Sequence, residues 1–280
     1  GKGVKGGITN EADVLTHFIG AHTHDDILFF TDKGRVFQTK VYEIPSASRV
    51  SKGQMIHNFL GIPANEKVSA IVAYGSEEKK NNPYLVIVTA GGVIKKTGLD
   101  KFENVRRSGI LAVNLSKGDE LKWAKLAGPK DEIVMTTAAG RAIRFKGGDV
   151  RAMGRTAGGV RGITLKKGDR VSSFDLVAPM KDARFLVVMV NGYAKQTPLK
   201  EYKLQRRGGQ GILTAKVTSK TGQVVSAHVI IEQTELLALS AKGLVLRTSI
   251  KSIRSAGRAT QGVRIMKLGA GDKIIGTVAL

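Results

Sequence analysis

The chain has 280 residues, of which 42% are hydrophobic, so it can bury a sizeable core in one or two domains. Its formal net charge of +22 implies a polyanionic partner, with nucleic acid as the first candidate and an anionic membrane surface as the second. It has no cysteine, which excludes disulfides and thiolate metal sites, and its apolar runs are too short to cross a bilayer, so we expect a cytoplasmic chain without a membrane partner.

A first motif, predicted to be a β-hairpin, recurs about every fifty residues. Each copy has a short apolar run, a glycine, and then alternating apolar and basic residues, as in FLVVMVNGYAKQTP from Phe185. Two β-prone runs around a tight turn favour a hairpin, and glycine supplies the positive φ that such a turn needs. The aligned glycines are Gly34, Gly92, Gly140, Gly192 and Gly243.

A second motif is a basic, glycine-rich loop that follows the hairpin and enters another apolar run. Its copies end at Gly3, Gly53, Gly109, Gly159, Gly211 and Gly262. An arginine stands four residues before the glycine in most copies, namely Arg49, Arg155, Arg207 and Arg258. These arginines have two interpretations: they bind phosphates, or they pair with acidic side chains between repeats.

A third motif closes each unit with a turn and one more strand, as in KGDELKWAKL from Lys117. Units of three or four strands, without helical spacing of apolar residues, predict an all-β chain built of β-propeller blades. The six loops predict six blades of about fifty residues in a single domain, the first blade being partial. The predicted boundaries are residues 1–24 for the partial blade and 25–76, 82–128, 130–178, 183–231 and 234–280 for the others.

Repetition of the basic loops predicts a ring of positive charge. Residues 150–162 and 250–264 hold arginines and a lysine but no acidic residue. Arginine offers charged, bidentate donors, and exposed loop N–H groups also bind phosphate, so we expect the ring to bind bent duplex DNA without reading its sequence. Aromatic residues are not interleaved with the basic ones, which disfavours single-strand or RNA binding. A protein-binding propeller scaffold is the alternative of a different class.

The string QRRGGQG at residues 205–211 resembles the box Q-R-R-G-G-x-G of the C-terminal domain of the gyrase A protein family. VRAMGRTAGGVRGI from Val150 and other strings along the chain are similar to the same family. The resemblance implies a six-bladed β-pinwheel that wraps double-stranded DNA. This domain would be a non-catalytic part of DNA gyrase, a bacterial, ATP-dependent type IIA topoisomerase that introduces negative supercoils. It implies the gyrase A catalytic core and gyrase B as partners, in the nucleoid. The C-terminal domain of a ParC-type topoisomerase IV protein is the close alternative.

The loops and the resemblance together predict the DNA contacts. The segment Gly1-Lys2-Gly3 looks like the tail of a first-blade box, and we extend that role to Lys5. The predicted contacts are Gly1, Lys2, Gly3, Lys5, Arg49, Lys52, Lys101, Arg106, Arg107, Arg151, Arg155, Arg161, Lys203, Gln205, Arg206, Arg207, Gly208, Gly209, Gln210, Gly211, Arg254, Arg258 and Arg264.

No catalytic residue, metal site or cofactor is predicted within the chain. The acidic residues in KGDE and KGDR are single and lie in turns, and the chain has no P-loop string. None of the tyrosines has a context like that of the cleavage tyrosine of type II topoisomerases. We therefore expect ATP, Mg and the cleavage tyrosine to belong to other parts of the holoenzyme.

Overall fold

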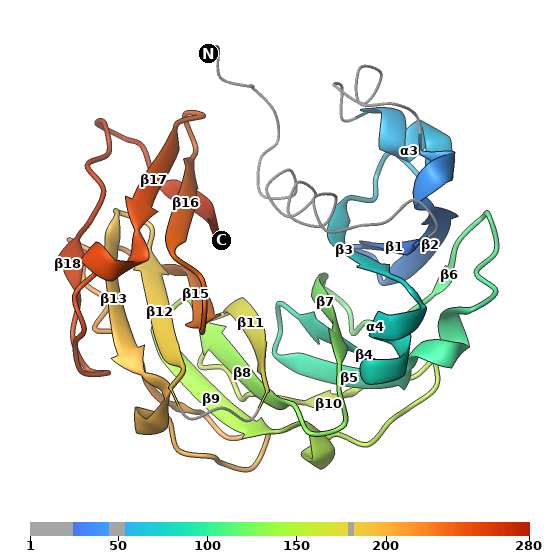
Figure 1. Cartoon of the computed structure of the whole chain (residues 1–280), viewed down its shortest axis with the longest axis horizontal. Coiled ribbons are helices and arrows are strands. Elements are labelled where there is room, and N and C mark those ends of the chain that lie inside the picture. The colour runs from blue at the N-terminus through green and yellow to red at the C-terminus, as the bar shows by residue number, and fades with distance from the viewer. Residues whose placement is uncertain (1–24, 45–53, 179–181) are drawn as a thin grey trace. The chain divides into compact units, whose positions relative to one another are not determined.

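The computed structural model describes residues 25–44, 54–178 and 182–280, whose strands form five antiparallel sheets (Figure 1). The described residues divide into two compact units. The N-terminal unit holds residues 25–129 and 150–160, and the C-terminal unit holds residues 130–149 and 161–280. The predicted partial blade, residues 1–24, lies outside the described ranges, so five sheets are seen and the predicted sixth blade is not confirmed.

The N-terminal unit has two sheets, with the strand orders β3-β1-β2-β6 and β10-β5-β4-β7. The first sheet is made of β1 (Asp26–Thr31), β2 (Arg35–Lys40), β3 (Val68–Tyr74) and β6 (Ile110–Leu111). The second is made of β4 (Tyr84–Thr89), β5 (Val93–Gly98), β7 (Leu121–Ala127) and β10 (Val160–Arg161), whose last residue is already counted with the C-terminal unit. Short 3-10 helices follow the hairpins at Val41–Glu43 and Leu99–Phe102.

The C-terminal unit repeats this plan, with the strand orders β11-β8-β9-β14, β15-β12-β13-β18 and β17-β16-β19. The third sheet has β8 (Glu132–Thr137), β9 (Arg141–Lys146), β11 (Val171–Val177) and β14 (Ile212–Leu213). The fourth has β12 (Arg184–Met189), β13 (Tyr193–Pro198), β15 (Val224–Ile230) and β18 (Val263–Arg264). The fifth has β16 (Glu235–Ser240), β17 (Val245–Ser249) and β19 (Ile274–Ala279). Its 3-10 helices are Gly147–Asp149, Leu199–Glu201 and Ile250–Ser252.

The predicted hairpins are confirmed in all five sheets. The first strand of the hairpin is buried along nearly its whole length in β1, β4, β8 and β12, which explains its continuous apolar run. The five aligned glycines all have positive φ. At Gly192, with φ +88°, a Cβ would also stand 2.4 Å from the carbonyl oxygen of Met266, so the turn admits no other residue without strain.

The apolar run after each basic loop does not pair within its own blade. Instead it crosses to the preceding sheet and forms a two-residue outer strand there, as β14 does beside β9 and β18 beside β13. The carbonyl of the hairpin glycine fixes this crossover, because the oxygen of Gly140 accepts from the N–H groups of Thr214 and Ala215. Within each unit, this exchange ties the basic loop to the hairpin of the preceding sheet.

The fifth sheet differs, since no strand of the described residues covers the outer edge of β17. In the other sheets the second residue after the hairpin glycine is fully buried beneath the exchanged strand: Val36, Ile94, Ala142 and Ala194 are each 0% exposed. The corresponding Val245 is 68% exposed, and Leu244 beside it is 49% exposed. Within the part of the chain that the structure describes, the outer edge of β17 is therefore apolar and lacks a covering strand.

The acidic residue of the third motif has a structural role in the hairpin turn of its own blade. Asp119 accepts a hydrogen bond from the N–H of Gly91 at 2.8 Å, and Asp169 accepts one from Ala139 at 3.0 Å. Asp272 accepts in the same way from Lys242 at 3.0 Å. These carboxylates satisfy turn N–H groups that would otherwise lack a partner in the fold.

Two short helices accompany the sheets of this all-β fold, and the spacing of apolar residues gave no sign of them: α3 (Gln54–Leu60) and α4 (Ser76–Asn81). Leu60 and the following Ile62 pack into the core of the first sheet. The Glu78 carboxylate accepts a hydrogen bond from the N–H of Gly75 and so caps α4. Both helices are shorter than the window in which a helical period is detectable. No helix in the described ranges is long and apolar enough to span a membrane.

Candidate nucleic-acid interface

Three basic loops, residues 151–159, 203–211 and 254–262, are fixed at both ends to the preceding hairpin. At the start of each loop a parallel bridge joins its second residue to the second hairpin strand, at Lys96↔Ala152, Arg144↔Leu204 and Gln196↔Ser255. After each loop the chain becomes the exchanged strand β10, β14 or β18. The middle of each loop is left at the surface, and none of these loops contains an acidic residue.

The loop 203–211 carries the box-like string and lies along the segment 161–164. The N–H of Gly208 donates to the carbonyl of Gly162 at 2.7 Å, and the N–H of Thr164 donates to the carbonyl of Gly209 at 2.9 Å. Gly211 has φ +73°, and a Cβ there would stand 2.5 Å from the carbonyl oxygen of Ala142. Glycine is needed at Gly211 because the loop backbone lies directly against β9.

The arginines four residues before the loop glycine have partners of a kind that the sequence did not predict. Arg207 donates from Nε to the carbonyl of Asp149 and from a terminal nitrogen to the carbonyl of Arg161, both at 3.1 Å. Arg258 donates to the carbonyl of Leu213 at 3.0 Å. Both arginines therefore anchor neighbouring loops through backbone oxygens rather than by pairing with acidic side chains.

Two loop supports escaped the sequence analysis. The guanidinium of Arg144 in β9 is paired with Glu132 at 2.7 Å and donates to the carbonyls of Leu199 and Tyr202. At the same strand position, the side-chain amide of Gln196 donates to the carbonyls of Ile250 and Ile253. Each side chain thereby holds the start of the loop that crosses to its sheet. In the sequence, Arg144 and Gln196 are simply polar residues among the apolar residues of a strand, and this pattern does not indicate that they hold a loop.

The predicted contacts that the structure describes lie mainly on the surface. The exposed ones are Lys101, Arg106, Arg107, Arg151, Arg161, Lys203, Arg206, Arg207, Gly209, Gln210, Arg254 and Arg264. The half-buried ones are Arg155, Gln205, Gly208, Gly211 and Arg258. The predictions at Gly1, Lys2, Gly3, Lys5, Arg49 and Lys52 lie outside the described residues.

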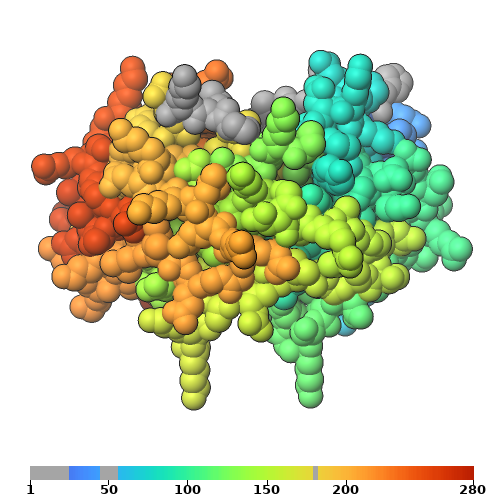
Figure 2. All heavy atoms as spheres, turned by 90° about the horizontal axis from the view of Figure 1, so that it is seen from below, coloured from blue at the N-terminus to red at the C-terminus, as the bar shows by residue number. Residues whose placement is uncertain are grey.

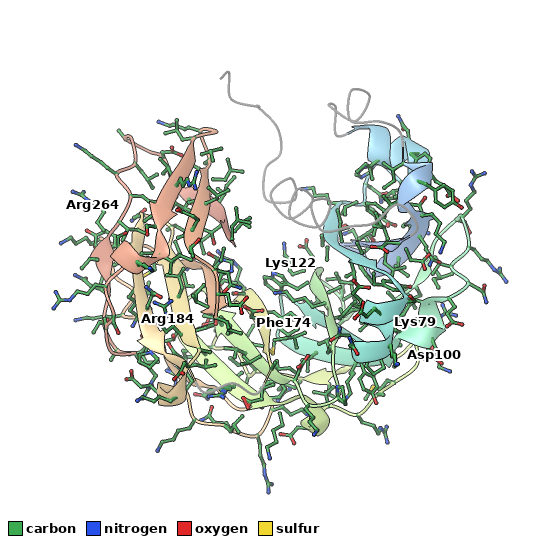
Figure 3. The ribbon with its side chains drawn as sticks, in the orientation of Figure 1. Lys79, Asp100, Lys122, Phe174, Arg184 and Arg264 are labelled. Carbon is green, nitrogen blue, oxygen red and sulfur yellow. The ribbon has the colours of Figure 1, made fainter. Side chains whose placement is uncertain are left out.

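Within the C-terminal unit, hydrogen bonds join neighbouring basic segments to one another. Arg207 bonds to the segment at Arg161, and the Lys216 N–H bonds to Thr260 in the next loop. Figure 2 shows the orange segment near residues 200–215 on the surface of this unit. Arg264 follows at the outer edge of the fourth sheet, beyond β13 (Figure 3). A polyanion on this surface would meet cations and loop backbone but no carboxylate of the loops.

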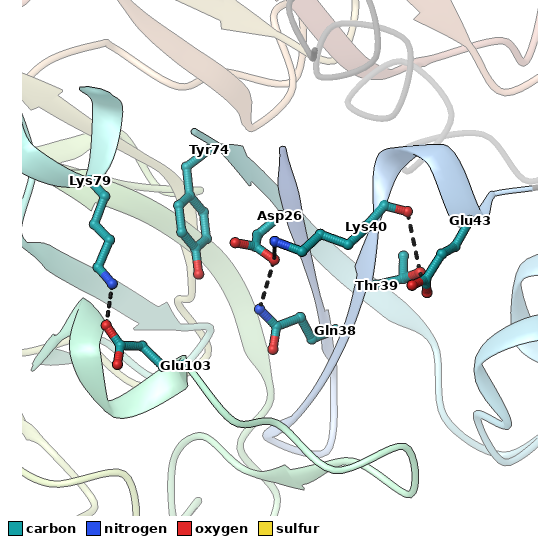
Figure 4. A pocket seen from close by; sticks show the side chains of 8 residues that line it. All are labelled: Asp26, Gln38, Thr39, Lys40, Glu43, Tyr74, Lys79 and Glu103. Carbon is teal, nitrogen blue, oxygen red and sulfur yellow. Dashed lines mark hydrogen bonds and ion pairs between the residues drawn. The ribbon is translucent and has the colours of Figure 1, made fainter. Parts of the chain in front are cut away.

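A cavity of about 300 Å³ in the N-terminal unit has a different character (Figure 4). Asp26 in this cavity is paired with Lys40 at 2.8 Å and accepts a hydrogen bond from Gln38, while Lys79 pairs with Glu103. The hydrogen bond to Asp26 raises the pKa of Lys40. These charged groups are engaged with one another, which gives the cavity mixed rather than basic character.

The comparisons with known proteins agree on one family. The family model described as "DNA gyrase C-terminal domain, beta-propeller" matches residues 25–73, 83–127, 131–178, 190–231 and 234–280. The gyrase A protein of Mycolicibacterium smegmatis is 42% identical over 277 residues, which are 98% of this chain and 32% of the relative. The gyrase A protein of Staphylococcus epidermidis is 38% identical over 279 residues, 100% of this chain and 31% of the relative. The chain thus spans about a third of these relatives' length.

Two solved structures share the fold at 25% sequence identity. The structure of a DNA gyrase A C-terminal domain aligns with a TM-score of 0.78 over 92% of this chain and 83% of that chain. The crystal structure of the C-terminal domain of a DNA topoisomerase IV aligns with a TM-score of 0.82 over 92% of this chain and 80% of that chain.

Proposed function

This chain belongs to the family of DNA gyrase A C-terminal domains, and from that premise we propose that it binds duplex DNA without sequence preference, bends it and wraps it around its basic loops. The observation that carries the proposal is the series of acid-free basic segments in the C-terminal unit that hydrogen bonds join together, from Arg161 through residues 203–211 to residues 254–264. Cations and backbone N–H groups recognise phosphates but not bases, so such a surface binds the DNA backbone.

The energies of binding and bending are compatible. Bending 20–30 bp of DNA through 40–90° costs about 1–6 kcal/mol. Each charge-assisted hydrogen bond to a phosphate contributes about 1.5–3 kcal/mol, so a few loops in contact offset the cost of the bend. We include in the proposal a sixth blade that contains residues 1–24, and contacts at the predicted positions in all six loops.

We propose that the parent protein is an ATP-dependent type IIA topoisomerase of the bacterial cytoplasm, associated with the nucleoid. In it this domain would support negative supercoiling beside the gyrase A catalytic core and gyrase B. The cleavage tyrosine, ATP and Mg would belong to those parts, and this domain would need no cofactor. The topoisomerase IV domain with a TM-score of 0.82 supports a ParC-type role as the second candidate. A protein-binding scaffold is the third.

DNA topology tests this function directly. A nicked plasmid is incubated with increasing amounts of the chain, sealed with ligase and stripped of protein, and its topoisomers are separated on a gel. Wrapping fixes writhe at each bound site, so we expect the linking number to change in proportion to bound protein. Binding without a change in linking number would reject wrapping and favour the topoisomerase IV candidate. Absence of DNA binding would favour the scaffold.

Neighbouring arginines in the box-like loop should behave differently when replaced. The Arg206 side chain is exposed and has no hydrogen bond to the described part of the chain. Arg206→Ala should therefore remove a phosphate contact and leave Tm unchanged. The salt slope, which is the change of log K for DNA binding with log salt concentration, should become shallower by about one unit. Arg207→Ala loses two hydrogen bonds to backbone oxygens and should lower stability by about 1 kcal/mol as well as weaken binding. Fluorescence anisotropy and thermal unfolding measure both effects. Equal Tm values for the two variants would contradict the anchoring role of Arg207.

A further inference from the structure

Two lysine side chains are buried beneath basic loops. Lys95 in β5 is 1% exposed, and Lys195 in β13 is 0% exposed. The Lys95 ammonium donates to the carbonyls of Ala112 at 2.7 Å and Arg155 at 2.5 Å. The Lys195 ammonium donates to the carbonyls of Gly257 at 2.8 Å and Arg258 at 2.5 Å. In both places the acceptor of the shorter bond is the loop arginine four residues before the glycine.

These lysines are an unfavourable choice for stability alone. An ammonium group that is buried without an ion pair loses hydration, and backbone carbonyls replace it only in part. Burial lowers the pKa of each lysine to about 8. The third residue after the hairpin glycine is apolar in the other three sheets, where Phe37, Ile143 and Leu246 stand at this position. The fold can therefore use a hydrophobic residue here, which suggests that the lysines serve another purpose.

The hydrogen bond to each lysine determines where the next peptide N–H points. In a trans peptide the C=O and the N–H point in opposite directions. Because the carbonyls of Arg155 and Arg258 point inward to the lysines, the N–H groups of Thr156 and Ala259 point outward, and both residues are exposed. Neither N–H has a hydrogen-bond partner among the described residues.

The box-like loop provides the contrast within the same chain. Its corresponding strand residue is Ile143, and the N–H that corresponds to Thr156 and Ala259 is that of Gly208. The Gly208 N–H is already bonded to the carbonyl of Gly162. In the two loops with a buried lysine, the residue after the loop arginine thus has an outward N–H without a hydrogen bond, whereas the corresponding N–H in the box-like loop is bonded.

We propose that Lys95 and Lys195 build two equivalent phosphodiester-binding sites, in which the N–H of Thr156 or Ala259 and the side chain of Arg155 or Arg258 bind one DNA phosphate. The lysine is a positioning residue in each site: it holds the loop carbonyl inward and adds a positive charge behind the phosphate. This inference rests on the proposed DNA binding and assigns to it two N–H donors and two buried charges.

The test compares the intact chain with the double variant Lys95→Met and Lys195→Met, using a fluorescein-labelled 40-bp duplex of mixed sequence. Ile143→Met, at the same strand position beneath the box-like loop, is the matched control. We expect the double variant to bind about tenfold more weakly and to lose about two units of salt slope, whereas the control binds like the parent. Because methionine removes two buried charges, the double variant should unfold at an equal or higher temperature. Weaker binding then cannot be ascribed to misfolding.

The pH dependence of DNA affinity distinguishes a binding role of the lysines from a purely structural one, because a purely structural lysine would leave this dependence unchanged. Arg155 faces Lys95, and Glu201 and Arg258 face Lys195; the pKa of each lysine is lowered to about 8, so both lysines lose their proton within the window from pH 7 to 9. The affinity of the parent should fall several-fold over this window, and that of the double variant should stay flat apart from the α-amino group that both proteins share. Folding changes in the opposite sense: a lysine pKa below its unfolded value makes stability rise from pH 8 toward 10.

The outcomes separate this inference from the proposed function. If the parent binds DNA and the double variant matches it in affinity and pH profile, the two phosphate sites are wrong, but DNA binding stands. If the parent does not bind the duplex, the proposed function itself fails. If the double variant does not fold, the pH profile of the parent alone decides, since a flat profile between pH 7 and 9 overturns the role of the lysines.

Discussion

Binding of duplex DNA to this chain should weaken about 10³–10⁵-fold when the salt concentration rises from 50 to 200 mM. The expectation assumes about 6–10 phosphate contacts, which is within reach of the exposed arginines and lysines in the described loops and a net charge of +22. Each neutralised phosphate releases condensed counterions, so log K falls with log salt by about 0.9 per contact. Anisotropy titrations at several salt concentrations give this slope, which should lie between about −5 and −9.

A cation outside the loops provides the control for this measurement. Lys122 is exposed on β7, where it pairs with Glu120 at 3.1 Å (Figure 3). Lys122→Gln changes the net charge by one, as does Arg206→Ala, but it should leave the slope as it is. A slope that responds equally to both variants would mean that overall charge, rather than the loop surface, attracts DNA. A slope shallower than about −2 would reject the multi-loop surface.

Replacement of Gly211 should produce the largest loss of stability among single methyl additions in the box-like loop. In Gly211→Ala the new Cβ stands 2.5 Å from the oxygen and 2.8 Å from the carbon of the Ala142 carbonyl, and the residue must keep a φ of +73°. A left-handed conformation costs a non-glycine residue about 1–2 kcal/mol, and overpacking against backbone costs about 1–3 kcal/mol more. The Tm of Gly211→Ala should therefore be lower than that of the parent by on the order of 10 °C.

Gly257→Ala is the matched control, since it lies in the next loop, has no positive φ, and its Cβ would meet nothing within 4 Å. We expect Gly257→Ala to leave Tm within about 2 °C of the parent. DNA affinity should fall with Gly211→Ala, because displacing the loop from β9 also displaces Arg206 and Arg207. If both variants unfold at the same temperature, the contact between the loop and β9 contributes nothing to stability.

The sequence predicted the local parts of this fold well. A hairpin has its signal within fifteen residues or so, and the turns at Gly34, Gly92, Gly140, Gly192 and Gly243 form as expected. The exchange of β14 and β18 into the preceding sheets was not predictable, because a two-residue strand has no pattern of its own and its partner is set by the fold of another repeat. The helices α3 and α4 escaped because they are too short to show a period.

For the candidate site the sequence predicted which loops carry charge but not what each cation does. Arg207 and Arg258 point toward backbone carbonyls, which have no sequence signature. Lys95 and Lys195 stand among the alternating apolar and basic residues of the hairpin motif, and nothing in that pattern indicates that the crossing loop buries them. The predicted DNA contacts remain predictions, including those in residues 1–24 and 45–53.

The outer edge of β17, which no strand of the described residues covers, bears on how copies of the chain meet one another. Where nothing outside the described ranges covers this edge, the backbone groups beside Leu244 and Val245 can pair with the same groups on another molecule and extend both sheets. In dilute, low-salt solution the charge of +22 keeps the copies apart by mutual repulsion. Salt or a bound polyanion screens this repulsion, so we expect association through the β17 edges to be favoured under the same conditions that shield the basic loops.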